Sequence, residues 1–235
     1  MGKKILLIDV NCNVGSTGKI VYETYEKINE SNNTAAIAYG RGKKQQKNNV
    51  FKFGIDGETR FHALMNRITG IHGSFSPFST YRLKKYIKKF KPDIIHIHEL
   101  HGYFVNIISL MKFIKKLNIP VIWTFHCEYM YEAKGHVYNE QEFPNWSRKD
   151  EYPRSVFFDR SLKTALRYKK LFSDFKQLTI LTPSDWLTNR AIKSGFFNCN
   201  IMTLYNSYND TVFYPRDEKR IAKKYNLNPD KNIIL

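Results

Sequence analysis

The sequence predicts an α/β fold built on an open, doubly wound and mostly parallel sheet. Short apolar runs rich in β-branched residues recur along the chain and alternate with segments of helical periodicity. Uninterrupted apolar runs are typical of strands buried on both faces of a parallel sheet, and the alternation is typical of successive strand–helix units. The expected strands are Lys4–Val10, Thr34–Tyr39, Val50–Phe53, Asp93–His98, Val121–Phe125, Leu178–Leu181 and Ile201–Leu204.

In the first half of the chain, the spacing of apolar side chains indicates the helices. One helical pattern covers about Gly18–Glu30, and another covers Glu58–Ile68. The clearest helix is Thr80–Lys91, which Pro92 ends because a proline cannot continue a helix. Its apolar stripe, at the i, i+3, i+4, i+7 spacing of one helix face, is Leu83, Tyr86, Ile87 and Phe90.

The second half of the chain continues the alternation, with one long interruption. Helices are expected at Asn106–Leu117 and Phe157–Ser173. Ser184 is the expected N-cap of a helix that runs to Gly195, because serine side chains accept hydrogen bonds from the free amides of a helix start. Residues 127–155 are polar, rich in aromatic side chains and aperiodic, and long segments of this kind are often functional.

The chain changes character near Pro215. The charged stretch Arg216–Lys224 indicates a linker with a short helix, and Ile233–Leu235 begins another apolar, strand-like run. We therefore expect an α/β domain over residues 1–215, a linker over 216–231 and the start of a further domain at 232–235, with an irregular C-terminal end as the simpler alternative for the last residues.

The composition excludes several classes of protein. Of the 235 residues, 42% are hydrophobic and 15% aromatic, which excludes a disordered chain. Three widely spaced cysteines do not form a disulfide framework, and no apolar stretch is long enough to span a bilayer, so we expect a cytoplasmic protein. With 38 Lys and Arg against 21 Asp and Glu, the net charge of +17 indicates an anionic partner: nucleic acid, a membrane surface or a phosphorylated substrate.

Candidate binding residues follow the strands, because ligands of open α/β sheets bind at the carboxyl ends of the strands. Gly15, Ser16, Thr17 and Gly18 lead from the loop after the first strand into a helix. The glycines permit a tight turn, and the free amides of a helix start can hold a phosphate. A plain strand–helix turn explains the same residues equally well.

Histidines follow the fourth and fifth strands. His96 and His98 share one face of the fourth strand, and for His96 a buried structural role is favoured over a metal site. His101, beyond the strand end, is the better functional candidate. His126, where the fifth strand ends, can donate to substrate oxygens or transfer protons near neutral pH. Cys127 fits a half-buried apolar role better than a nucleophile, because no orienting Asn or Asp is evident.

The basic residues gather on two expected helices. Lys84, Lys85, Lys88 and Lys89 lie on Thr80–Lys91, away from its apolar stripe, and further lysines lie on Asn106–Leu117. A solvated helix face is the simplest explanation, and a basic amphipathic surface that meets an anionic membrane is the functional one. Specific nucleic-acid binding is not expected, because no helix-turn-helix or RNA-recognition signature is present.

A series of motifs, spread over residues 3 to about 215, occurs in a fixed order. They are Gly15–Ile20, Ala38–Gly42, Lys91–Asn106, Pro120–His126, Thr182–Leu187, Leu204–Ser207 and Val212–Pro215. In this order and spacing the chain resembles the N-terminal half of GT-B-fold glycosyltransferases of family 4, also called group 1. It is most similar to the branch found in the synthesis of colanic acid, capsules and other surface polysaccharides.

The resemblance implies a Rossmann-like domain that holds the acceptor of a retaining glycosyltransferase. The co-substrate would be a nucleotide diphosphate sugar, with no cofactor and no metal, and the acceptor a glycan or a lipid-linked glycan. By analogy, Gly15–Gly18 would lie near the donor diphosphate, and His126 would be the catalytic residue. His101, Tyr103 and Glu128 would bind the acceptor.

The resemblance also implies partners beyond the substrates. Lys84, Lys85, Lys88 and Lys89 would face the inner side of the membrane, as a peripheral contact. The donor-binding domain would begin near Asn232, so the 235 residues alone are expected to be inactive. Close relatives carry several cysteines after the fifth strand, whereas Gly135–Tyr138 has none. A non-catalytic basic module that binds anionic lipid or nucleic acid is the alternative.

Overall fold

The computed structural model describes residues 2–132, 153–215 and 218–228. The chain divides into two units, Met1–Tyr205 and Asn206–Leu235. The first unit is the α/β domain, and the second contains a short helix, α8 (Glu218–Tyr225). A short helix is therefore present where the sequence predicts one, and it falls within the second unit.

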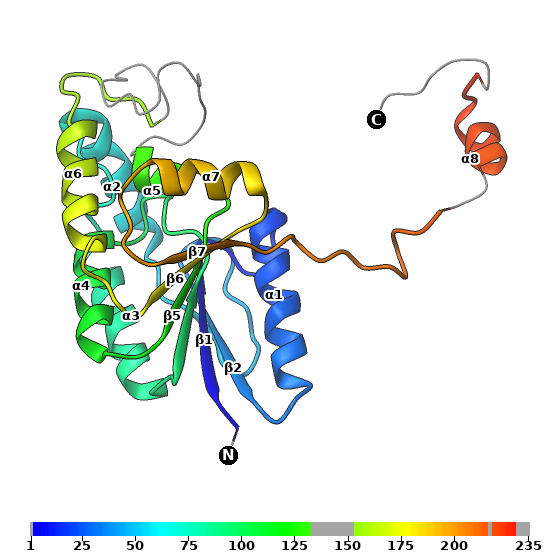
Figure 1. The fold of residues 1–235 in the computed structure, drawn as a ribbon, viewed down its shortest axis with the longest axis horizontal. Coiled ribbons are helices and arrows are strands. Elements are labelled where there is room, and N and C mark those ends of the chain that lie inside the picture. Colours follow the sequence, from blue (N-terminus) through cyan, green and yellow to red (C-terminus); the bar gives the residue numbers. More distant parts are fainter. Residues whose placement is uncertain (1, 133–152, 216–217, 229–235) are drawn as a thin grey trace. The chain divides into compact units, whose positions relative to one another are not determined.

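The first unit is built on a single sheet of seven parallel strands, so the predicted fold class is confirmed (Figure 1). The strand order is β3-β2-β1-β4-β5-β6-β7. The chain first moves outward from β1 and then returns to place β4 beside β1, which is the doubly wound arrangement. The strands are β1 (Lys4–Asp9), β2 (Thr34–Tyr39), β3 (Val50–Lys52), β4 (Ile94–Ile97), β5 (Val121–Thr124), β6 (Leu178–Thr182) and β7 (Asn200–Thr203).

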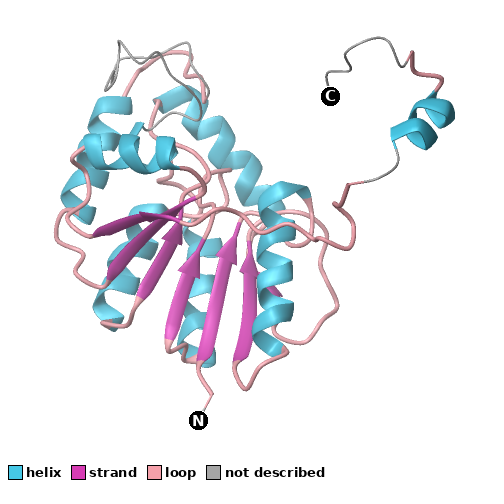
Figure 2. Ribbon diagram, turned by 45° about the vertical axis from the view of Figure 1, so that its right-hand side comes forward, coloured by secondary structure: helices cyan, strands magenta, loops and turns pink. Residues whose placement is uncertain are grey.

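Helices cover both faces of this sheet (Figures 1 and 2). Helix α1 packs on one face through a small apolar cluster that includes Leu7, Val21 and Ile37. The larger apolar cluster contains side chains from α3, α4, α6 and α7, and Trp123 of β5 is its largest fully buried member. The helices of this unit are α1 (Gly15–Asn29), α2 (Asp56–Thr69), α3 (Pro77–Phe90), α4 (Ile107–Leu117), α5 (Tyr129–Glu132), α6 (Ser161–Phe172) and α7 (Asp185–Lys193).

Local capping explains where several helices begin. The predicted N-cap Ser184 is confirmed, since its hydroxyl accepts a hydrogen bond from the amide of Leu187 in α7. Asn106 caps α4 in the same way. Helix α3 begins at Pro77 rather than at Thr80, because the carboxylate of Glu58, on α2, accepts hydrogen bonds from the first amides of α3.

Two further helices begin at residues other than those that the sequence predicts. Helix α1 begins at Gly15 rather than Gly18, so the glycine-rich segment forms its first turn instead of a preceding loop. Helix α6 begins at Ser161 rather than near Phe157, because the carboxylate of Asp159 binds both the amide and the hydroxyl of Ser161.

Candidate functional site

The carboxyl ends of β1, β4 and β5 meet at the point where the strand order reverses. Because β1 lies between β2 and β4, the connections that leave β1 and β4 run in opposite directions, and open α/β sheets bind their ligands at such a switch point. Asp9 ends β1, the segment His98–His101 follows β4, and His126 follows β5. The strands thus bring the predicted histidines to one edge of the sheet.

The start of α1 has the features of an anion-binding helix terminus. Gly15 adopts a left-handed backbone conformation (φ 73°), and the N-cap residue Val14 gives no side-chain hydrogen bond to the helix. The first turn contains no acidic side chain. Gly18 is buried, and a Cβ there would lie 3.4 Å from backbone atoms of Asn11. The uncapped amides and the helix dipole favour a negatively charged ligand at this end.

Three histidines form a connected row across β4 and β5. Nε2 of His96 lies 2.9 Å from the hydroxyl of Thr124, and Nδ1 of His98 lies 3.1 Å from Nε2 of His126. The rings of His98 and His126 are nearly parallel, with centroids 5.4 Å apart. The indole of Trp123 donates to the carbonyl of His98 and fixes the end of β4. The His96 side chain is hydrogen-bonded inside the domain, which agrees with the structural role predicted for it from the sequence.

Burial keeps this row of imidazoles neutral near pH 7. Desolvation lowers the pKa of His96 to about 4, and it lowers the pKa of His98 well below the usual value, with repulsion from His96 and His126 adding to the effect. Burial also lowers the pKa of His126. Nδ1 of His126 has no hydrogen bond within the described part of the chain, so this neutral ring can accept a proton or a hydrogen bond from a ligand.

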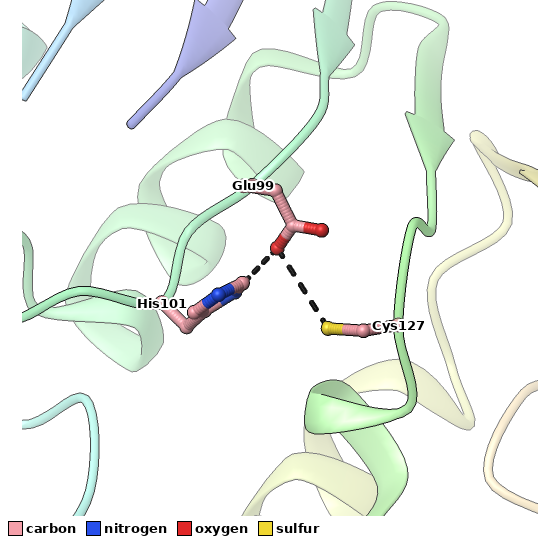
Figure 3. Close-up of side chains that lie close together, drawn as sticks. All are labelled: Glu99, His101 and Cys127. Carbon is pink, nitrogen blue, oxygen red and sulfur yellow. Dashed lines mark hydrogen bonds and ion pairs between the residues drawn. The ribbon is translucent and has the colours of Figure 1, made fainter. Parts of the chain in front are cut away.

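Beside this row, Glu99, His101 and Cys127 form a compact cluster. Figure 3 shows one carboxylate oxygen of Glu99 between the His101 ring and the Cys127 thiol. Glu99 forms an ion pair with Nδ1 of His101, and its oxygen lies 4.0 Å from Sγ of Cys127. Burial lowers the pKa of His101, but the bonds to Cys127 and Glu99 outweigh it and raise the pKa to about 11. Burial, together with the Glu99 charge, raises the pKa of Cys127.

Asp9 adds a second buried carboxylate to this edge. Its side chain is fully buried and accepts hydrogen bonds from the amides of Glu99 (3.1 Å) and Asn11 (3.3 Å). Desolvation outweighs these bonds and raises its pKa to about 7. Sequence reasoning missed Asp9 and Glu99 as site residues. The signal for both was their position, since each acidic residue ends or directly follows an apolar strand.

Comparison with known proteins identifies the family. A family model described as Glycosyltransferase Family 4 matches residues 33–211, which is most of the α/β domain. The chain belongs to glycosyltransferase family 4. It therefore contains a domain of the group 1 glycosyltransferases, as the motif order suggested.

Comparison with solved structures finds distant likenesses. A putative NAD-dependent epimerase/dehydratase from Methylobacillus flagellatus is 15% identical, with a TM-score of 0.37. The enzyme WbmG of Bordetella bronchiseptica, in complex with NAD and UDP, is 11% identical with the same TM-score. Each match covers 77% of this chain, which spans only about half of either structure (54% and 52%). A comparison with curated proteins found no match.

In this family 4 domain, the two remaining acceptor candidates have different surroundings. Tyr103 is half-buried in the loop after β4 with a left-handed backbone conformation (φ 70°), and its ring packs against His62. Glu128 is only 4% exposed, and its carboxylate forms an ion pair with Arg190 of α7. Glu128 therefore has a structural role in holding α7 beside α5, and its binding of an acceptor stays a prediction.

The four predicted membrane-facing lysines of the family 4 domain also differ from one another. The ammonium of Lys84 donates to the hydroxyl of Ser109 on α4 and is partly buried. Lys85, Lys88 and Lys89 are exposed along α3. No described helix combines the length and the apolar composition needed to cross a bilayer.

Proposed function

We propose that this chain provides the acceptor-binding side of a retaining glycosyltransferase. The enzyme would transfer a sugar from a nucleotide diphosphate sugar to a glycan or lipid-linked acceptor in surface polysaccharide synthesis, of the colanic-acid or capsule type. The main support for the proposal is the family 4 match over residues 33–211, together with the neutral side chain of His126 at the carboxyl edge of the sheet. The uncapped start of α1, with Gly15–Gly18, supports a diphosphate at the same edge.

The residues at this edge have the properties that such a reaction requires. An acceptor hydroxyl oxygen forms a bond to the anomeric carbon, while the bond from that carbon to the diphosphate breaks and the diphosphate leaves with the electron pair. The amides of the first turn of α1 would stabilise the departing negative charge. Nδ1 of His126 would accept the proton that the acceptor hydroxyl loses, and His98 would orient His126 through the 3.1 Å contact. His101 and Tyr103 would position the acceptor.

Replacement of His126 by alanine tests this function. In the protein that the whole gene encodes, His126→Ala should lower the transfer rate by about 10²–10⁴-fold, because a positioned proton-handling group contributes about this much. The measurement is turnover of nucleotide sugar with acceptor extract, with melting temperature as the check on folding. Cys199→Ser, at a half-buried residue that directly precedes the amino end of β7, is the matched control. Full activity of His126→Ala would remove it from the mechanism.

Two basic surfaces support a peripheral contact with the inner face of a membrane. The first is the exposed row Lys85, Lys88 and Lys89 on α3. The second is a groove between α4 and α6 whose lining includes five cationic side chains. They are Lys112, Lys115, Lys116, Arg167 and Lys170. Anionic headgroups attract clustered lysines and arginines near a bilayer, and such attraction would bring the domain to a lipid-linked acceptor.

A further inference from the structure

Glu99, His101 and Cys127 bring three different metal-ligating groups together. One ligand atom from each residue lies within 4.8 Å of the other two. Around a tetrahedral zinc ion, ligand atoms bound at about 2.0–2.3 Å lie roughly 3.3–3.8 Å from one another, so only small side-chain adjustments separate the cluster from that geometry. The distance of 4.0 Å between the Glu99 oxygen and Sγ of Cys127 is close to this range.

The backbone holds these ligands in the short segments that follow two adjacent parallel strands. The amide of Glu99 donates to Asp9, and the amide of the preceding residue, His98, donates to the carbonyl of Ile8 in β1. His101 follows after one intervening residue, and its ring packs against the buried ring of Tyr129, with centroids 5.2 Å apart. Cys127 follows the end of β5, which pairs with β4. The three groups therefore converge because the short segments that contain them follow two neighbouring strands of the sheet.

The local charges allow a cation to take the place of the proton that pairs His101 with Glu99. Asp9 and Glu99 are both buried carboxyl groups, and the amide of Glu99 bonds to Asp9. Among the described residues, the ion pair of Glu99 is with His101, and no lysine or arginine forms an ion pair with either carboxylate. The side chain of His101 is one-third exposed, so an ion can reach the cluster from solvent.

We propose that Glu99, His101 and Cys127 bind one zinc ion. A carboxylate, an imidazole and a thiolate together form a donor set that suits a borderline-soft ion such as Zn²⁺, whereas Mg²⁺ and Ca²⁺ prefer oxygen ligands alone. Three protein ligands leave a fourth position for water or a substrate oxygen. This departs from the metal-free site that the family resemblance implies, and it does not rest on the proposed transferase activity.

A second chemistry could use the same three groups. A cysteine, a histidine and a carboxylate also occur together in thiol nucleophiles, where the histidine draws the proton from sulfur. In this cluster the thiol lies near the imidazole of His101 and also near the carboxylate oxygen of Glu99, whose negative charge opposes formation of the thiolate. A bound cation reverses this effect, because it stabilises the thiolate as a ligand. Zinc binding therefore accounts for the arrangement better than a nucleophile does.

Cobalt provides a direct probe, because Co²⁺ bound to a thiolate gives a near-ultraviolet sulfur-to-cobalt absorption band. The 235-residue chain, treated with chelator and then titrated with Co²⁺, should bind one ion per chain with that band, and one equivalent of Zn²⁺ should remove it. Cys127→Ser should abolish the band, and Glu99→Gln should weaken binding by about tenfold or more. Cys12→Ser and Cys199→Ser are the matched controls and should keep the band.

A measurement on the unmodified chain covers the case in which a variant fails to fold. Zn²⁺ should slow alkylation of Cys127 by iodoacetamide at least about tenfold, as read by peptide mass spectrometry, because the metal occupies the thiolate. The alkylation of Cys199 should not change. The proposal is overturned if no sulfur-to-cobalt band forms, if the band survives in Cys127→Ser, or if Cys127 is alkylated equally fast with and without Zn²⁺.

Discussion

At the scale of single residues, the carboxyl edge of the sheet concentrates groups whose titration is shifted by burial. Asp9 is the clearest case, because its carboxyl group is fully buried and its pKa is raised from 3.8 to about 7. Two backbone amides stabilise the ionised form, but they do not compensate for the loss of water around the charge. The folded chain therefore holds Asp9 protonated at pH values where the unfolded chain has released the proton.

The substitution Asp9→Asn tests this interpretation of the edge. A raised carboxyl pKa gives stability that is complete below about pH 4 and is lost as the pH rises to about 7. The Asp9→Asn variant does not lose this stability as the pH rises. The difference between its free energy of unfolding and that of the wild type should therefore increase with pH. The gain between pH 4 and pH 7 should be on the order of 4 kcal/mol. Denaturant unfolding in chelator provides the measurement, and a constant difference would contradict a raised pKa of Asp9.

At the scale of elements, apolar patterns located the strands, and the strand boundaries are correct to within one or two residues. Helix starts were harder to predict, because the groups that fix them are remote or atypical. Helix α3 is capped by Glu58 from α2, a partner that no local pattern reveals. Helix α1 begins at a glycine in a left-handed conformation, which resembles a loop in the sequence. The helix α5 has only four residues and too few turns to show a period.

The exposed lysines of α3 allow a test of the proposed membrane contact. Lys85→Glu with Lys89→Glu should weaken binding to vesicles of anionic lipid by at least about tenfold, because each lysine near such a surface contributes about 1 kcal/mol. Lys43→Glu with Lys44→Glu, two exposed residues outside α3, is the matched control. Sedimentation with vesicles at increasing salt gives the measurement. Equal losses in both variants, or tight binding to oligonucleotides with none to vesicles, would favour the alternative of a non-catalytic basic module.

At the scale of the whole molecule, the candidate site exists only because of the strand order. The sequence showed which residues follow each strand, and so pointed to His101 and His126. It did not show that β4 lies between β1 and β5, which brings Asp9 beside Glu99 and brings Cys127 beside His101. Glu99 supplies the carboxylate beside Cys127 that no nearby residue in the sequence suggested. Contacts between residues that follow different strands depend on the geometry of the loops, which the periodicity of apolar residues does not encode.

The buried titratable groups together predict how the domain responds to acid. Burial lowers the pKa of His62 and His96 to about 4 and that of His98 well below 6.5, so these rings stay neutral in the fold but gain protons on unfolding below pH 6.5. Asp9 has the opposite effect, because it is protonated in the folded domain and releases one proton on unfolding. Between pH 6 and 5, unfolding should therefore take up about two protons or more, since burial also lowers the pKa of His126, and stability should fall by about 3 kcal/mol per pH unit.

Single variants separate these contributions. His62→Asn should reduce the slope by about 1 kcal/mol per pH unit, because the residue at position 62, on α2, then takes up no proton. Asp9→Asn should increase the slope by a similar amount, since it removes the opposing proton. Urea unfolding of the metal-free chain at several pH values between 5 and 6 gives each slope. Stability that is constant or rises as the pH falls would show that the buried histidines are not neutral in the folded domain.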